Sequence, residues 1–241
     1  MRIALFSDIH ANLPALEAFF SDVEGRKVDA LYCLGDLVGY NTWPDEVIAE
    51  IRSRGIPTIA GNHDLKVKKL RQDENLQEVD YAYHIGSDEA REYLRTLPEF
   101  IRIQYSLSEE LISVLLVHGS TRSINEYLSE DLPEEYVKEL LLEANADILF
   151  CGHTHKPYHR LIHTSGKYKH VVNIGSVGKP KDGDPRGCYV ILTLSEDSTL
   201  INTQSIKVDF VRFEYDVEKA AKAVEDSPLP NEFADRLRKA Y

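Results

Sequence analysis

Five short motifs contain side chains that bind metal ions or move protons, and each follows an apolar run typical of a β-strand. Any one of them recurs by chance in many chains of this length, so a single motif predicts little. In open α/β sheets, ligands bind beyond the carboxyl ends of the strands, which is where all five fall. Together they predict one shared site, formed by Asp8-Ile9-His10, Gly35-Asp36, Gly61-Asn62-His63-Asp64, Val117-His118-Gly119 and Gly152-His153-Thr154-His155.

The potential ligands are four imidazoles, two carboxylates and one amide oxygen, from His10, His118, His153, His155, Asp8, Asp36 and Asn62. This set exceeds what one tetrahedral ion binds, and it suits two divalent ions about 3.5–4 Å apart that share one carboxylate. Two such ions with two carboxylates and a bridging hydroxide keep a net charge of about +1, which favours an anionic phosphate ester. Mixed nitrogen and oxygen ligands suit Mn, Fe, Co, Ni or Zn, of which we favour Mn.

Each of these residues also has an ordinary structural interpretation. Asp36 is placed like a turn aspartate, Asn62 beside a glycine like a capping residue, and His118 like a histidine at a strand end. Cys151 precedes the last motif, so that stretch also reads Cys-x-His-x-His, as in a thiolate site. Because the ligand set is complete without sulfur and Cys151 ends an apolar run, we expect this thiol to lie in the core.

Short apolar runs alternate with amphipathic segments over the first 65 residues. The pattern predicts strands at 2–7, 29–35 and 56–62 and helices at 13–25 and 44–55. Asn12 is placed to cap the first helix, with Pro14 in its first turn. This order predicts a parallel sheet covered by helices. Because residues two apart on a strand point the same way, the two histidines of the last motif are expected to face one site, as are Asp8 and His10.

The remaining chain has a different pattern. Residues 66–98 are polar, charged and helical in character, which predicts a cap-like helical insertion. Further on, the pattern predicts hairpins at 99–120, 158–176 and 187–208, a helix at 133–146, a strand at 147–152 and two helices within 216–241. We find no internal repeat, and we predict a single domain over residues 1–241.

Composition narrows the functional classes. The 241 residues include 40 acidic and 28 basic side chains, for a formal net charge of −12. Such a balance disfavours non-specific binding to duplex nucleic acid or to anionic membranes. The three cysteines are widely spaced without a Cys-x-x-Cys pair, which indicates a reducing compartment. With no signal-peptide pattern and no apolar run of about 20 residues, we expect a cytoplasmic protein; no pattern specifies an oligomeric state.

The order of the motifs is similar to that of the calcineurin-like metallophosphoesterase superfamily. Within it, the chain resembles the small bacterial and archaeal phosphoesterases of the YfcE/diadenosine-tetraphosphatase type. The stretches that carry this resemblance are SDIHANLPALEA, GDLVGY, AGNHD, VHGS, CGHTH and NIGSVGKPKDGDPRGCYV. The resemblance implies a mixed α/β fold: a four-layer α-β-β-α sandwich of two mixed β-sheets flanked by helices, with a small helical insertion.

The resemblance also implies a role for each motif residue. One metal would be held by Asp8, His10 and His155, the other by Asn62, His118 and His153, with Asp36 bridging both. A hydroxide between the metals would attack phosphorus in line. The catalytic side chains would be His63, which donates a hydrogen bond to the phosphoryl group or protonates the leaving oxygen, and Asp64, which orients or charge-stabilises His63.

Three further residues are candidates for substrate binding. Asn12 is expected to contact substrate or to cap the helix that follows it. Arg186 is expected to bind a phosphate or to be a solvated turn residue. Tyr40 is expected to line the site or to pack beside it.

We therefore predict a two-metal phosphoesterase whose small substrate is a phosphodiester, a phosphomonoester, or a dinucleoside polyphosphate or other nucleotide. The alternative is a catalytically silent metal-binding scaffold or protein-interaction module, which the complete ligand set and His63 disfavour. A barrel amidohydrolase also carries His-x-His, but on its first strand, whereas here that motif comes late. We expect residues 66–98 and the loops after Asp36 and His118 to read the leaving group.

Overall fold

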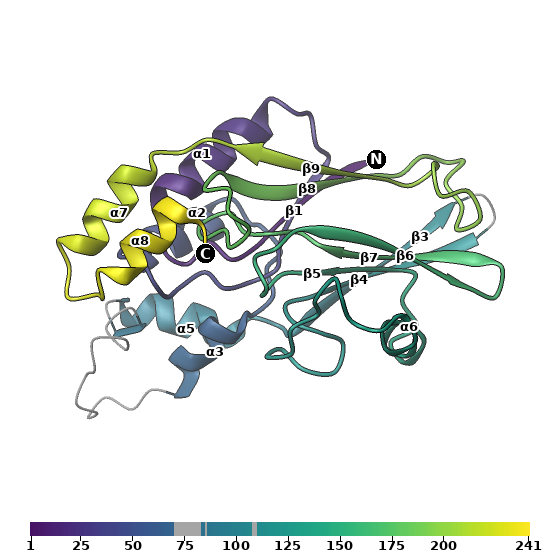
Figure 1. Ribbon diagram of the computed structural model, residues 1–241, viewed down its shortest axis with the longest axis horizontal. Helices are drawn as coiled ribbons and strands as arrows, with labels where there is room; N and C mark the ends of the chain where they lie inside the picture. The colour runs from purple at the N-terminus through teal and green to yellow at the C-terminus, as the bar shows by residue number, and fades with distance from the viewer. Residues whose placement is uncertain (70–82, 85, 108–109) are drawn as a thin grey trace.

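The computed structural model describes residues 1–69, 83–84, 86–107 and 110–241, and two β-sheets form its centre (Figure 1). The first sheet has the order β2-β1-β8-β9, with β1 at Arg2–Phe6, β2 at Ala30–Cys33, β8 at Gly187–Thr193 and β9 at Lys207–Phe213. The second has the order β3-β4-β5-β7-β6, with β3 at Phe100–Leu107, β4 at Glu110–Val117, β5 at Ile148–Cys151, β6 at Tyr158–Thr164 and β7 at Lys167–Asn173.

Both sheets are mixed. In the first, β1 runs parallel to β2 and antiparallel to β8, which pairs antiparallel with β9. In the second, β4, β5 and β7 are parallel, while β3 and β6 form antiparallel edges. Because the carboxyl ends of β1, β2, β4 and β5 meet at one end of the molecule, the loops that follow them can build one site.

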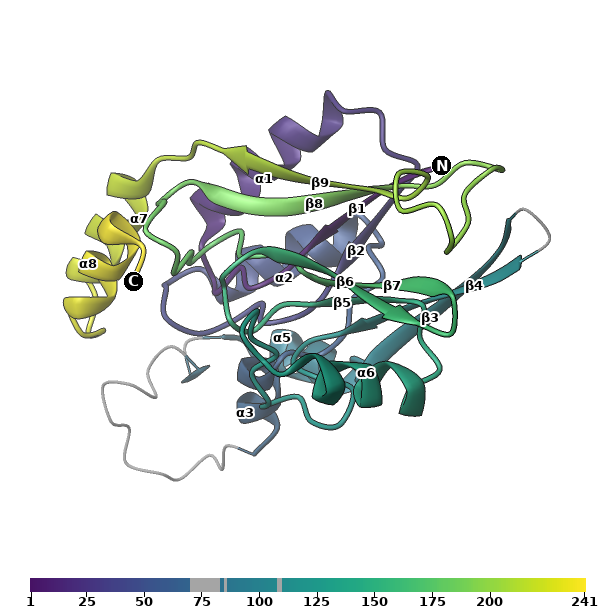
Figure 2. The same ribbon diagram turned by 45° about the vertical axis from the view of Figure 1, so that its right-hand side comes forward.

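Helices cover the outer faces of the two sheets (Figures 1 and 2). Helix α1 (Leu13–Glu24) and helix α2 (Pro44–Ser53) pack on the first sheet, and helix α6 (Glu134–Glu143) packs on the second. A separate apolar layer lies between the sheets, where Leu5 and Val190 meet residues such as Phe150. The predicted four-layer α-β-β-α sandwich is confirmed.

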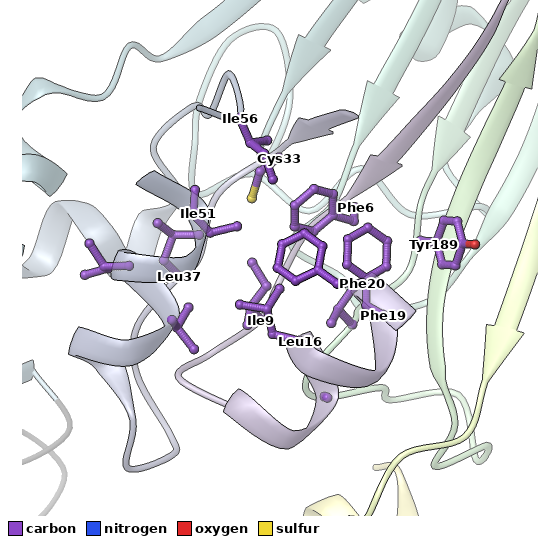
Figure 3. Packing of buried hydrophobic residues seen from close by; sticks show 14 of the residues in the cluster. Phe6, Ile9, Leu16, Phe19, Phe20, Cys33, Leu37, Ile51, Ile56 and Tyr189 are labelled. Atoms are coloured by element: carbon purple, nitrogen blue, oxygen red, sulfur yellow. The ribbon is translucent and has the colours of Figure 1, made fainter. Parts of the chain in front are cut away.

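Helix α1 shows how the sequence builds one of these layers. Asn12 caps it by accepting a hydrogen bond from the Ala15 N–H (3.2 Å), as predicted. Its apolar residues recur at helical spacing and turn toward β1, where the Phe6 ring lies 4.3 Å from the Phe19 ring, centroid to centroid. Figure 3 shows this packing, with Phe20 beside the same pair.

One predicted strand is absent as a strand. Within 56–62 only Thr58 pairs with β2, through an isolated parallel bridge to Cys33. The backbone then turns away, because the Ala60 N–H donates to the carbonyl of Pro98 (2.8 Å) rather than to β2. The third unit of the predicted parallel sheet is therefore an extended segment that delivers the next motif to the site.

The predicted hairpins and terminal helices are confirmed with shifted ends. In the hairpin predicted at 187–208, the second strand begins only at Lys207, after a turn-rich connection in which the Ser198 hydroxyl donates to the carbonyl of Ser205 (2.7 Å). Helices α7 (Val217–Glu225) and α8 (Glu232–Lys239) form their own small apolar cluster, which reaches Tyr40 and Trp43.

The segment predicted as a helical insertion at 66–98 is described in part. Helix α3 (Asn62–Lys69) enters it and helix α5 (Asp88–Thr96) leaves it, while residues 70–82 and 85 lie outside the described residues. Among the described residues, no helix combines the length and the apolar character that crossing a membrane requires.

Candidate metal centre

The structure brings all seven predicted ligands to the carboxyl ends of the strands. Two separate groups of side chains place their ligand atoms within 4.8 Å of one another: Asp8 with His10 and His155, and Asp36 with His118 and His153; a third group, His10 with Asp36 and His63, takes one residue from each. The amide oxygen of Asn62 lies 3.1 Å from Nε2 of His118, so it belongs with the second group. These groupings coincide with the two ligand sets that the resemblance implies.

Asp36 lies between the two groups. Its Oδ2 is 3.6 Å from Nε2 of His10 and 3.3 Å from Nε2 of His118. Its other oxygen, Oδ1, accepts a hydrogen bond from the backbone N–H of His63 (2.8 Å). One carboxylate oxygen is thus anchored to the protein while the other faces both groups, which is the arrangement that a bridging ligand requires.

The paired ligands do not face the site for the predicted reason. β1 ends at Phe6 and β5 at Cys151, so neither pair lies on a strand. Asp8, His10, Asp36, His153 and His155 all have positive φ, between 52° and 65°. A left-handed backbone is uncommon outside glycine and costs roughly 1–3 kcal/mol per residue. Sharp left-handed turns after the strands, rather than strand alternation, aim these side chains at one point.

Hydrogen bonds to carbonyl groups define which nitrogen of each histidine is free. Nδ1 of His10 donates to the carbonyl of Val38 (3.0 Å), Nδ1 of His118 donates to that of Leu34 (2.8 Å), and Nδ1 of His155 donates to that of Lys179. A carbonyl can only accept, so Nδ1 carries the proton and Nε2 is free to bind a metal. For His153 the roles are reversed, since its Nε2 donates to the carbonyl of Asn125 (3.2 Å) and Nδ1 is left free.

Two observations test whether these residues fit metal ions. Nε2 of His10 and Nε2 of His155 lie 3.2 Å apart, although both are lone-pair acceptors once the Nδ1 protons are assigned. In addition, the buried oxygens Asp8 Oδ1 and Asp36 Oδ2 have no hydrogen-bond partner in the described part of the chain. Facing acceptors and orphaned carboxylate oxygens are costly unless a cation lies between them. The donor set therefore fits divalent ions.

The pKa shifts of the site residues, without any metal ion, also indicate that the site requires positive charge. Burial by itself raises the pKa of Asp36, but His118 and His63 outweigh it, and the pKa lies well below the ordinary value. Burial conversely lowers the pKa of His118, yet Asp36 raises it to about 10 overall, so in the metal-free protein this imidazole keeps a second proton on Nε2 that a bound ion would displace. Burial lowers the pKa of His10 and of His155. Two charged carboxylates among mostly neutral imidazoles are what divalent cations require of their ligands.

Two glycines allow the motif loops to approach each other. Gly35 has φ +87° and lies back to back with Gly61, so that a Cβ on either residue would overlap the other loop. At Gly61 the overlapping atoms include Oδ1 of Asp36 itself. These glycines are therefore needed for the bridging carboxylate to reach its position.

His63 lies beside the centre and contacts two tyrosine rings. Its ring centroid is 4.9 Å from that of His10 and 4.8 Å from that of Tyr40. The hydroxyl of Tyr83 lies 2.5 Å from Nδ1 of His63. Burial lowers the pKa of His63 to about 4, although Asp36 opposes this shift. When the Tyr83 hydroxyl donates to Nδ1, the neutral ring presents Nε2–H as a donor.

Asp64 has a different set of partners from the one expected. Its carboxylate accepts hydrogen bonds from the backbone N–H groups of Asp36 (2.8 Å), Leu37 (2.9 Å) and Gly61 (2.8 Å). Among the described residues, no hydrogen bond joins it to the ring of His63. Asp64 therefore ties the loop that carries Asp36 to the loop that carries Asn62, and its role toward His63 stays a prediction.

Replacing Asp64 by alanine is expected to lower the free energy of unfolding by about 3 kcal/mol or more, because three buried N–H groups lose their acceptor at about 1–3 kcal/mol each. Urea denaturation of the metal-free protein measures this. The matched control is Asp209→Ala, at an exposed position on β9, which should change stability by less than about 0.5 kcal/mol. Unchanged stability in Asp64→Ala would favour the role through His63.

The three candidate substrate residues have different outcomes. Asn12 is fully buried, and its amide group donates to the carbonyl of Gly178 (2.8 Å) while capping α1, so it has the capping role. Arg186 is half exposed and pairs with Asp184 (2.7 Å), as a solvated turn arginine does. Tyr40 does line the centre, with its ring 4.9 Å from that of His10.

Three residues near the centre were missed by the sequence reasoning. Tyr83 contacts His63, and Tyr127 stacks on His153 with ring centroids 4.2 Å apart. Lys179 is only 1% exposed, which is rare for lysine. Both tyrosines lie in segments that are expected to contact the leaving group. The sequence therefore predicted the segments but not the individual residues. Lys179 lies within NIGSVGKPKDGDPRGCYV, where nothing in the pattern indicates burial.

A sequence profile described as the calcineurin-like phosphoesterase superfamily domain matches residues 1–197. An uncharacterised protein of Methanocaldococcus jannaschii is 31% identical over an alignment 262 residues long, which covers 98% of this chain and 96% of the relative.

Two solved structures are similar over the full length. A metallophosphoesterase from Sphaerobacter thermophilus superposes with a TM-score of 0.81 at 29% identity, covering 100% of both chains. A hypothetical protein from Pyrococcus horikoshii superposes with a TM-score of 0.76 at 24% identity, covering 100% of this chain and 98% of that one. The second likeness concerns the fold alone.

Proposed function

The chain belongs to the calcineurin-like phosphoesterase superfamily, and we propose that it hydrolyses phosphate esters at a centre of two divalent metal ions, with Mn favoured. The observation that carries the proposal is the pair of buried, unpartnered carboxylate oxygens, Asp8 Oδ1 and Asp36 Oδ2. A protein tolerates such atoms when a cation binds them in the working state.

The residues sort into two ligand sets around a shared carboxylate. Asp8, His10 and His155 would hold one ion, and Asn62, His118 and His153 the other, with Asp36 between them. Divalent ions held by these residues would supply Lewis acidity, which would make water a stronger nucleophile toward phosphorus and would offset charge on the phosphate oxygens.

The chain's own residues prepare the site for this chemistry. The carbonyl groups of Val38, Leu34 and Lys179 hold three histidines in one tautomer, so their Nε2 atoms need no rearrangement before they bind. His63 presents Nε2–H to the phosphoryl group while the Tyr83 hydroxyl contacts its Nδ1. A neutral N–H donor aimed at developing negative charge stabilises the transition state.

Three tyrosine rings lie beside the centre, where they would contact the leaving group. Tyr40 and Tyr83 contact the ring of His63, and Tyr127, which is 56% exposed, stacks on His153. Aromatic rings of this kind suit a flat leaving group such as a nucleoside or an aryl group. We therefore place nucleotide-like phosphodiesters, phosphomonoesters and dinucleoside polyphosphates first among the substrates.

The test combines metal binding with turnover. Purified protein is stripped with a chelator, and thermal unfolding is followed as Mn²⁺, Co²⁺, Ni²⁺, Fe²⁺ or Zn²⁺ is added. We expect the unfolding midpoint to rise, because ions that bind only the folded state stabilise it by mass action, about 2.7 kcal/mol at 100 times the dissociation constant. The loaded protein is then assayed against phosphomonoesters, phosphodiesters and dinucleotides.

Turnover of an ester that disappears on chelation supports the proposal. Stabilisation by metals without hydrolysis of any ester would instead favour the metal-binding scaffold. Absence of both effects would overturn the metal centre itself.

A further inference from the structure

One charged side chain beside the centre lacks a partner. Lys179 is 1% exposed, and its Nζ has no hydrogen-bond acceptor in the described part of the chain. Its ammonium lies 4.4 Å from the centroid of the Tyr40 ring. An aromatic face compensates a buried ammonium only in part, since the three N–H donors still need acceptors. Burying an unpaired charge is costly, so this position calls for an anion.

The backbone around Lys179 is held rigidly against the ligands of the first metal group. Its N–H donates to the Ser176 hydroxyl (2.8 Å), which in turn donates to the carbonyl of Asp8 (2.8 Å). Its carbonyl accepts from Nδ1 of His155. Because its backbone is hydrogen-bonded to Asp8, through Ser176, and to His155, Lys179 cannot move independently of the centre. A residue that determines substrate specificity must be held in this way.

Further positive charge gathers at the same place. Lys181 follows two residues later, is partly buried, and donates its backbone N–H to the carbonyl of His155 (3.3 Å). Arg236 on α8 pairs with Glu232, but no ion pair of Lys179 or Lys181 occurs within the described ranges. Asp8 and Glu232 offset the positive charge near Lys179 only in part, and a bound anion would relieve the remaining repulsion.

The contacts of the Tyr40 ring indicate where the anion would lie and therefore which anion it would be. The same ring contacts the Lys179 ammonium and the rings of His10 and His63. The ammonium is therefore separated by one aromatic contact from His10, a candidate metal ligand, and from His63, which would meet the phosphate under attack. We propose that Lys179 binds a second phosphate of the substrate, next to the one that is hydrolysed, so that the site prefers substrates with two or more linked phosphates. This inference rests on the proposed function.

The experiment compares two inhibitors that differ by one phosphate. The chromogenic ester that the enzyme turns over fastest is the reporter, and inhibition constants of AMP and ADP are measured at a fixed concentration of free metal. We expect ADP to bind the wild type at least about tenfold more tightly than AMP, since a charge-assisted bond contributes about that factor. In Lys179→Gln the two constants should agree within about twofold, and Lys179→Arg should keep the preference.

Two further measurements separate binding from structure. Lys156→Gln removes an exposed positive charge from the loop between β5 and β6 and should leave the ratio of the two constants unchanged. Lys179→Met removes the buried charge while keeping the length of the side chain. Its unfolding midpoint should equal or exceed that of the wild type, because a residue kept for binding does not stabilise the fold.

Each outcome has a definite meaning. An ADP preference that survives in Lys179→Gln, or an equal loss for AMP and ADP, overturns the second phosphate subsite. A large drop in the unfolding midpoint of Lys179→Met would assign the lysine a structural role and overturn it as well. If no ester is hydrolysed by the wild type, the proposed function itself falls.

Discussion

Asp36→Asn is expected to abolish tight binding of metal ions and to lower kcat/KM by on the order of 10³-fold or more. The amide keeps the size of the carboxylate, and its oxygen can still accept the hydrogen bond from the His63 N–H. It cannot supply the charged oxygen that lies 3.6 Å from His10 Nε2 and 3.3 Å from His118 Nε2. Both ligand groups therefore lose the atom that they share.

The measurement is metal content by elemental analysis after gel filtration, together with turnover of the best ester. The metal-free variant should unfold below the temperature of the metal-free wild type, because the pKa of Asp36 lies well below its ordinary value and its charge therefore stabilises the fold through His118. Asp209→Asn, at an exposed position on β9, is the matched control and should keep both metal and turnover. Full activity in Asp36→Asn would exclude a bridging role.

His63→Ala is expected to lower kcat by about 10²–10³-fold while both metals stay bound. The reason is that His63 contacts the centre through ring packing on His10 and Tyr40, whereas the ligand sets are complete without it. Tyr83→Phe removes only the hydroxyl that contacts Nδ1 of His63, and we expect this variant to lower kcat by about tenfold.

The dependence on pH distinguishes the two chemical roles of His63. Burial lowers its pKa to about 4, so the protonated form is rare at neutral pH and becomes rarer by tenfold with each further pH unit. If the protonated ring were the acid, kcat would fall as pH rises from 5 to 7. If the neutral N–H is the donor, this group contributes no slope in that range. Loss of metal in His63→Ala would instead make it a ligand, since its ring also groups with His10 and Asp36.

Local patterns in the sequence carried much of the architecture. The alternation of apolar residues in 99–120 predicts the hairpin of β3 and β4, and the cap at Asn12 predicts where α1 begins. The extended segment at 56–62 was predicted less well, because its pairing depends on where the chain goes next. Local propensity cannot report a backbone bond to a residue as distant as Pro98.

By itself, the sequence determined the chemical inventory and the place of each motif, because ligand types and strand ends are local properties. The tertiary structure alone decided how those side chains are aimed. The left-handed turns at Asp8 and His155, and the clamp that Asp64 makes on the Asp36 loop, arise from contacts between segments far apart in the chain. The burial of Lys179 has the same origin. A lysine side chain costs free energy, and so suggests a function, only where the fold removes its charge from water.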